Sequence, residues 1–305
     1  MKAVVFAARS AGVCGLQALL DRGVEVLKVF AEAVPAGAEG FYDSPAEFCR
    51  ERDIPFAFCS GEELPALISE VRDLSPEAGF AFDFYSVLQP ELVSLSAQGF
   101  YFLHLSLLPA CQGPWPVNRA ILEGERKTGV TLGRVFGAPL QAREAARREV
   151  WISNHDTAPS LYHKLAREGA ELLDRTLPSL KAGSLDWKPL EMKPGSHYRS
   201  PEEAARIDWL LRSFQVYNRV RALTRPFGGA YTVLDKETMI VWRAMPDDTN
   251  PGLLSAGELD ADEGKLYVGT REGAVRLLEV EWKGELLEEP RIAEVVGPYW
   301  PQKFE

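Results

Sequence analysis

Short apolar runs alternate with amphipathic stretches along the first half of the chain. The apolar runs predict strands at residues 3–8, 24–30, 79–82, 99–104, 129–135 and 149–153. The stretches between them predict helices at residues 12–21, 44–52, 61–72 and 115–123. This alternation is typical of an α/β domain with a Rossmann-like open parallel sheet that helices cover.

The pattern changes in the second half of the chain. Residues 156–181 form one long amphipathic pattern, with Thr157 as a helix cap and Gly183 just past the end. A connector rich in Pro, Gly and Ser follows, and after it the apolar runs at 229–245, 264–269 and 274–282 predict β-hairpins. We therefore expect an N-terminal domain over residues 1–187, a linker over 188–201 and a smaller β domain over 202–305.

Composition narrows the class of protein. The 305 residues carry a net charge of -10, and residues 201–305 alone hold 13 Lys and Arg against 19 Asp and Glu. Because nucleic-acid affinity depends on basic side chains, this balance argues against a nucleic-acid-binding surface.

The cysteines give a second indication. The four of them have no CxxC spacing and are expected to be reduced thiols, and no metal site is expected. No leader-like or membrane-spanning apolar segment is visible, so we expect a cytoplasmic protein with no membrane partner.

The segment 102–116, followed by Thr-Gly-Val-Thr at 128–131, carries the strongest signal for a functional site. It reads Phe-Leu-His-Leu-Ser-Leu-Leu-Pro-Ala-Cys-Gln-Gly-Pro-Trp-Pro. His104 ends an apolar run and opens a turn bounded by proline. Because ligands collect at the carboxyl ends of the strands in open α/β sheets, His104 is placed as a site residue.

This segment resembles the core of the formyltransferase family that uses 10-formyltetrahydrofolate. The family pattern is Asn-hydrophobic-His-x-Ser-Leu-Leu-Pro, then Thr-Gly-Val-Thr, then an Asp about ten residues later. His104, Ser-Leu-Leu-Pro at 106–109 and Thr-Gly-Val-Thr match it, whereas Phe102 stands at the Asn position and Leu140 at the Asp position. Further likeness along most of the chain is greatest to the branch that formylates amino sugars on a nucleotide.

The resemblance implies a formyltransferase fold with a small, open, OB-like β-barrel at the C-terminus. It implies 10-formyltetrahydrofolate as co-substrate, His104 as the catalytic residue, and an acceptor such as a UDP-linked amino sugar. Some members of the family act on tRNA, but the acidity of residues 201–305 makes tRNA an unlikely partner here. The residues that it implies around the co-substrate are Ser86, Val87, Leu88, Ser106 and Gly113.

Three functional hypotheses remain open. The first is formyl transfer to a small-molecule amine with impaired or altered catalysis, because Phe102 cannot donate a hydrogen bond to an oxyanion and Leu140 cannot pair with an imidazolium. The second is a non-catalytic homologue that binds folate, a nucleotide sugar or a protein. The third, hydrolysis of formyl-folate, needs the same three catalytic residues.

Two alternatives also remain open for individual segments. His104 could equally be a structural imidazole. The glycine-containing segment 9–15 could either approach a phosphate or serve helix packing.

Overall fold

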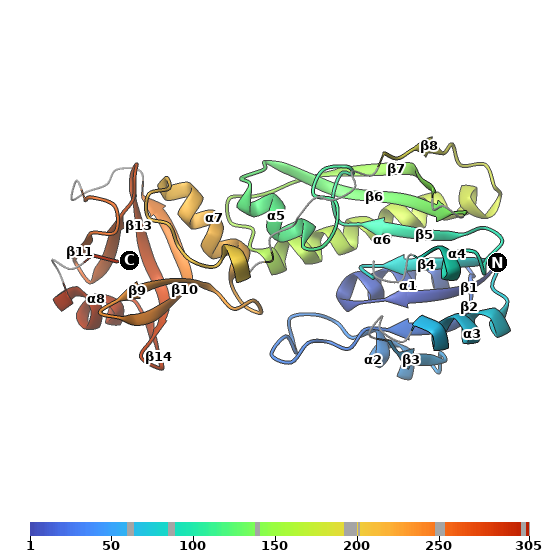
Figure 1. Cartoon of the computed structure of the whole chain (residues 1–305), viewed down its shortest axis with the longest axis horizontal. Coiled ribbons are helices and arrows are strands. Elements are labelled where there is room, and N and C mark those ends of the chain that lie inside the picture. Colours follow the sequence, from blue (N-terminus) through green and yellow to red (C-terminus); the bar gives the residue numbers. More distant parts are fainter. Residues whose placement is uncertain are drawn as a thin grey trace. The chain divides into compact units, whose positions relative to one another are not determined.

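An eight-stranded sheet forms the centre of the N-terminal unit of the computed structural model (Figure 1). The structure describes residues 1–59, 64–84, 89–137, 141–191, 200, 202–247, 254–299 and 303–304. The chain divides into two compact units, which are described separately. The first comprises Met1–Pro116, Arg126–Ile152 and Ser160–Ser196, and the second comprises Val117–Glu125, Ser153–Pro159 and His197–Glu305.

The strands of the large sheet run in the order β3-β2-β1-β4-β5-β6-β7-β8. Their bounds are β1 Lys2–Ala7, β2 Glu25–Ala31, β3 Phe56–Phe58, β4 Ala78–Phe82, β5 Phe100–His104, β6 Lys127–Phe136, β7 Gln141–Trp151 and β8 Lys188–Pro189. Neighbours from β3 to β5 are parallel, and those from β5 to β8 are antiparallel. The expected α/β class is confirmed, with a sheet that is mostly rather than wholly parallel.

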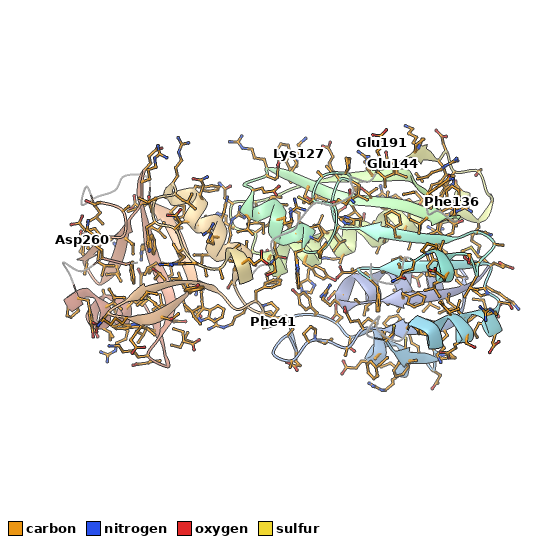
Figure 2. All side chains as sticks on the ribbon, viewed as in Figure 1. Phe41, Lys127, Phe136, Glu144, Glu191 and Asp260 are labelled. Atoms are coloured by element: carbon orange, nitrogen blue, oxygen red, sulfur yellow. The ribbon has the colours of Figure 1, made fainter. Side chains whose placement is uncertain are left out.

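Four helices, α1 to α4, connect the parallel strands, α5 lies between β5 and β6 in the chain, and a long helix, α6, follows β7. Their bounds are α1 Arg9–Asp21, α2 Pro45–Arg50, α3 Leu64–Leu74, α4 Pro90–Val93, α5 Pro116–Leu122 and α6 Ala158–Lys181. The first three residues of the helix expected at 61–72 lie outside the described residues. The strand expected at 149–153 belongs to a longer strand, β7, which pairs with β6. Lys127 and Phe136 mark the two ends of β6, and Glu144 lies on β7 (Figure 2).

Aromatic side chains fill the core of the N-terminal unit. The rings of Phe6 and Phe30 stack at 4.7 Å, and the ring of Phe100 lies 5.8 Å from that of Phe6. β4 and β5 are buried along their whole length, which explains why they read as continuous apolar runs. Helix α1 lies close to this sheet because Gly15 has no side chain: a Cβ there would lie 2.5 Å from the ring of Phe82.

An antiparallel sheet forms the C-terminal unit, in the order β11-β12-β13-β10-β9, with β14 paired to β13. The bounds are α7 Ser213–Leu223, β9 Ala230–Leu234, β10 Glu237–Asp247, β11 Leu259–Asp262, β12 Lys265–Gly269, β13 Ala274–Trp282, β14 Glu285–Glu288 and α8 Arg291–Val296, with short 3-10 turns at Glu202–Ala204 and Gly297–Tyr299. Helix α7 packs against β10. The expected β domain after the α/β domain is therefore present.

Candidate functional site

His104 is the last residue of β5, as the apolar run predicts. β5 lies between β4 and β6, and His104 pairs across the sheet with Thr131 of β6. Only 4% of the His104 side chain is exposed. The imidazole therefore sits at the carboxyl end of an inner strand, screened from bulk water.

The turn after β5 fixes the orientation of the imidazole. The Ser106 hydroxyl lies 2.9 Å from His104 Nδ1 and 2.6 Å from the carbonyl of Ala110. Because a hydroxyl has one hydrogen, donation to Ala110 leaves the Ser106 oxygen to accept from Nδ1–H. Thr131 holds the same turn: its hydroxyl donates to the carbonyl of Ser106 at 2.7 Å and accepts from the Leu108 N–H at 3.0 Å.

Burial lowers the pKa of His104 from its usual value to about 4, and a backbone hydrogen bond to Gly113 partly opposes this shift. Gly113 has a left-handed backbone, with φ of +92°, which glycine adopts without strain. The imidazole is consequently neutral at physiological pH. A neutral imidazole can accept a proton, although so low a pKa makes it a weak base near pH 7.

Phe102 lies in the hydrophobic core and is 3% exposed. It shares a face of β5 with Phe100 and His104, because alternate residues of a strand point the same way. Its ring covers the backbone of Gly133, its partner on β6: a Cβ on Gly133 would lie 2.1 Å from the Cζ atom of Phe102. The position that the resemblance assigns to a polar amide is thus part of the core packing.

Several expected site positions lie outside the described residues. These are Leu140, at the position of the family Asp, and Ser86, Val87 and Leu88, which were expected beside the co-substrate. Ser106 and Gly113 are described, and both contact His104. The structure therefore brings together the part of the expected site that surrounds His104.

An ion-pair cluster that the sequence did not reveal lies along the same edge of the sheet. Arg9 follows β1 and Asp83 follows β4, at the point where the strand order changes direction. The Nε atom of Arg9 donates to the carboxylate of Asp83 at 2.8 Å, and the hydroxyl of Tyr162 on α6 donates to the same carboxylate at 2.7 Å. In open α/β sheets this crevice is the usual place for a ligand.

The cluster is buried and electrostatically coupled. Burial is the largest single influence and acts to lower the pKa of Arg9, but the Asp83 carboxylate, with smaller contributions from Tyr162 and Glu32, opposes it, so the pKa of Arg9 is raised. Burial, together with the Asp83 charge, raises the pKa of Tyr162, which keeps the phenol neutral and able to donate. Burial also raises the pKa of Glu32, the first residue after β2. Polar side chains therefore lie at the carboxyl ends of four neighbouring strands. In the order of the sheet these are Glu32 after β2, Arg9 after β1, Asp83 after β4 and His104 at the end of β5.

Arg9 and Asp83 both have left-handed backbones, with φ of +50° and +55°. Such conformations cost a residue other than glycine on the order of 1–2 kcal/mol, and they occur where surrounding interactions hold them. Here both residues belong to one hydrogen-bonded pair, in which the Oδ2 atom of Asp83 accepts from Arg9 and from Tyr162.

The glycines at the start of α1 serve helix packing. A Cβ on Gly12 would lie 2.9 Å from Ala7, and Gly15 lies against Phe82 as described above. The N–H of Ala11 donates to the hydroxyl of Tyr162 at 3.3 Å. These contacts favour the packing interpretation of segment 9–15 over the phosphate-binding one.

Within the described parts of the chain, no three His, Cys, Asp or Glu side chains lie close enough together to hold a metal ion. Of the helices that are described, none has the length and apolar character needed to cross a bilayer.

The sheet order, the polar residues along its carboxyl edge and the separate antiparallel β unit define a two-unit α/β protein with a site of the doubly wound type. Residues 4–177 match the family described as "Formyl transferase", and residues 199–289 match "Formyl transferase, C-terminal domain". The chain belongs to the formyl transferase family.

Solved structures with the same fold include sugar N-formyltransferases. An N-formyltransferase from Helicobacter canadensis, in complex with folinic acid and dTDP-3-aminofucose, has a TM-score of 0.69 at 16% identity, over 90% of this chain and 98% of that one. WlaRD, a sugar 3N-formyl transferase solved with dTDP and 5-N-formyl-THF, has a TM-score of 0.67 at 16% identity, over 93% and 98% of the two chains.

HypX from Aquifex aeolicus, in complex with tetrahydrofolic acid, has a TM-score of 0.65 at 19% identity. The match covers 99% of this chain but 48% of HypX, so this chain spans about half the length of that protein. At these identities the likeness establishes the shared fold.

Proposed function

We propose that the chain transfers a formyl group from 10-formyltetrahydrofolate to the amine of a small-molecule acceptor, such as a nucleotide-linked amino sugar, at a rate well below that of an enzyme with a complete catalytic triad. The observation that carries this proposal is the neutral His104 at the carboxyl end of β5, oriented by Ser106. Family membership and the folate and sugar-nucleotide ligands of the two sugar N-formyltransferases support it.

His104 would act on the protons of the reaction. The acceptor amine attacks the formyl carbon, a C–N bond forms, and the carbonyl oxygen becomes negative in a tetrahedral intermediate. The imidazole of His104 takes the proton that the amine loses and returns it to N10 of the folate as the bond from N10 to the formyl carbon breaks. The products are a formamide and tetrahydrofolate.

The slow rate follows from Phe102. Its ring offers no hydrogen bond to the developing oxyanion, and loss of one such donor costs roughly 2.7–4 kcal/mol, or a hundredfold to a thousandfold in rate. The low pKa of His104 reduces the rate further, because proton transfer is most efficient when the pKa of the base lies near the working pH.

A second candidate function is binding without turnover. The burial of Phe102 against Gly133 favours it, because that packing occupies the position of the family Asn with an apolar ring. Under this alternative the chain binds a folate or a nucleotide sugar and releases it unchanged.

The test has two stages on the full chain. Calorimetry with 5-formyltetrahydrofolate, a stable analogue of the donor, measures binding. Single-turnover reactions with 10-formyltetrahydrofolate and a panel of UDP- and dTDP-linked amino sugars then measure the formamide by mass spectrometry. His104→Gln is the test variant, and Arg291→Gln, at an exposed residue of α8, is the control.

Formamide that forms with the unsubstituted chain and the control, but not with His104→Gln, supports formyl transfer, provided that His104→Gln still binds the folate analogue. Folate binding with no product from any amine rejects formyl transfer and supports the second candidate. If neither the folate analogue nor any of the sugar nucleotides binds, both candidates are rejected.

A further inference from the structure

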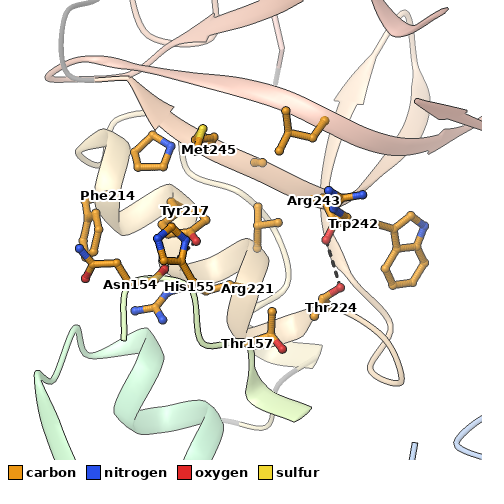
Figure 3. A pocket seen from close by; sticks show the side chains of 14 residues that line it. Asn154, His155, Thr157, Phe214, Tyr217, Arg221, Thr224, Trp242, Arg243 and Met245 are labelled. Atoms are coloured by element: carbon orange, nitrogen blue, oxygen red, sulfur yellow. Dashed lines mark hydrogen bonds between the residues drawn. The ribbon is translucent and has the colours of Figure 1, made fainter. Parts of the chain in front are cut away.

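A cavity of about 460 Å³ lies wholly within the C-terminal unit, between one face of α7, the strand β10 and the segment before α6 (Figure 3). Its volume is in the range of pockets that hold small organic ligands. Its described lining residues include none of those that surround His104.

Helix α7 supplies one wall. Phe214, Tyr217 and Arg221 lie three and four positions apart and therefore occupy one face of the helix, directed into the cavity (Figure 3). β10 supplies the facing wall. Its pairing with β13 shifts register on both sides of Arg243, which marks a β-bulge at this point. A bulge redirects side chains, and here consecutive residues from Trp242 to Pro246 line the cavity.

The third wall is a loop that α7 holds in place. The guanidinium of Arg221 donates to the carbonyl of Ser153 at 3.0 Å and to that of Asp156 at 2.6 Å. The hydroxyl of Tyr217 donates to the carbonyl of Asn154 at 2.7 Å. These three bonds fix the backbone on both sides of His155, whose side chain lines the cavity.

The lining is cationic in an acidic unit. It includes the guanidinium groups of Arg221 and Arg243, and among its described residues none carries a carboxylate. Within the described part of the chain, Arg243 pairs with Glu279 at 3.7 Å, but that buried carboxylate also binds Arg225. Two guanidinium groups thus share one carboxylate, which leaves positive charge beside the cavity.

The lining also exposes large apolar side chains. Phe214 is 36% exposed and Met245 is 47% exposed, and both are among the six large hydrophobic residues that the described part of the chain leaves exposed. Exposed apolar groups that meet in a concave site, rimmed by polar residues, are typical of a ligand-binding groove.

We propose that this cavity binds a small organic anion with an aromatic ring. Phe214 and Met245 contact the ring, and Arg243 binds its carboxylate or phosphate group. Arg221 is committed to the carbonyls of the 153–156 loop, so its role is to position that loop, whereas Arg243, with a side chain 62% exposed, is available to an incoming anion.

The test uses fluorinated aromatic probes and ligand-observed ¹⁹F NMR on the full chain. 4-(Trifluoromethyl)benzoate and 4-(trifluoromethyl)phenyl phosphate represent the two sources of the anion, and 4-(trifluoromethyl)benzamide is a neutral probe of the same shape. Arg243→Gln removes the charge, and Phe214→Ala removes the ring contact. The matched controls are Arg291→Gln and Leu286→Ala, which change an exposed Arg of α8 and an exposed Leu of β14.

We expect at least one anionic probe to bind with an affinity about tenfold above that of the amide, and Arg243→Gln to abolish this difference. Phe214→Ala should weaken the binding of all three probes, while the two control substitutions should leave binding unchanged. The anionic probe that binds more tightly identifies the charged group of the ligand as a carboxylate or a phosphate. Equal binding of anions and amide, no binding of either anion, or anion binding that survives Arg243→Gln overturns the proposal.

Discussion

Arg9 and Asp83 join the carboxyl ends of β1 and β4 through a hydrogen-bonded ion pair of 2.8 Å. The Asp83 side chain is 6% exposed and that of Arg9 is 23% exposed. Tyr162 completes the pair from α6, so three segments of the chain meet on one carboxylate. Arg9 and Asp83 themselves have left-handed backbone conformations, and they lie at the crevice where an open α/β sheet usually binds its ligand.

Asp83→Asn should lower the free energy of unfolding by about 3 kcal/mol, because it leaves the Arg9 guanidinium without its charge partner in a largely buried site. Tyr162→Phe should cost about 1 kcal/mol, since it removes one hydrogen bond. Urea denaturation measures both. Asp174→Asn, which breaks the exposed pair with Arg22, is the control and should have little effect. Equal costs for Asp83→Asn and Asp174→Asn would contradict the assigned burial.

The pKa of His104 makes stability depend on pH in the acid range. In the unfolded chain the imidazole has its usual pKa of about 6.5, whereas the folded value is about 4. The unfolded state therefore binds more protons between these values, so stability is fully present above about pH 6.5 and falls as the pH drops towards 4. The loss from this group should reach about 3 kcal/mol.

His104→Gln should flatten this dependence, as urea titrations at several pH values will measure. The corresponding direct measurement is the imidazole resonance of His104 in NMR, assigned by its absence in His104→Gln. It should keep the chemical shift of the neutral form at pH 5. A midpoint near 6.5 would show that the ring is hydrated in solution.

The contact between Phe102 and Gly133 can be measured with a double-mutant cycle. Gly133→Ala should destabilise the chain by about 2 kcal/mol or more, because the new Cβ would overlap the Phe102 ring. In a Phe102→Ala background, itself less stable by about 3–5 kcal/mol, the same change should cost little. Gly228→Ala is the control, since nothing surrounds its Cβ position. Additive costs would mean that the two positions do not touch.

Arg221 holds the loop of residues 153–156, and this can be tested by hydrogen exchange. Arg221 is 4% exposed, and burial lowers the pKa of its guanidinium. Arg221→Met should therefore leave the carbonyls of Ser153 and Asp156 without their donor, accelerate exchange of the loop amides and reduce stability by at least about 2 kcal/mol. Tyr217→Phe should have a smaller effect, and Arg291→Met none. Unchanged exchange in Arg221→Met would mean that the loop is fixed by other contacts.

The sequence predicts the inner strands of the large sheet well, because strands buried on both faces appear as continuous apolar runs. It predicts β7 poorly. Residues 141–149 read Gln-Ala-Arg-Glu-Ala-Ala-Arg-Arg-Glu, which are mostly strong helix formers, yet antiparallel pairing with β6 makes them a strand. β3 and α4 escape prediction because three and four residues are too few to establish a period.

The candidate site, too, could be predicted from the sequence only in part. The position of His104 at a strand end could be predicted from local sequence alone. The partnership of Arg9 with Asp83 could not, because the two residues are 74 positions apart and neither belongs to a recognisable motif. Asp83 does directly follow an apolar strand, which is the one local signal that could have directed attention to it.

The Phe102–Gly133 contact also limits how this chain can change over generations. A single replacement of Phe102 by Asn would place an amide in an apolar core and leave a ring-sized void over Gly133. The singly substituted chain would therefore be less stable. A larger residue at position 133 cannot arrive first, because the ring occupies its space. Either single substitution is therefore expected to destabilise the chain, so that positions 102 and 133 tolerate change best when both change together.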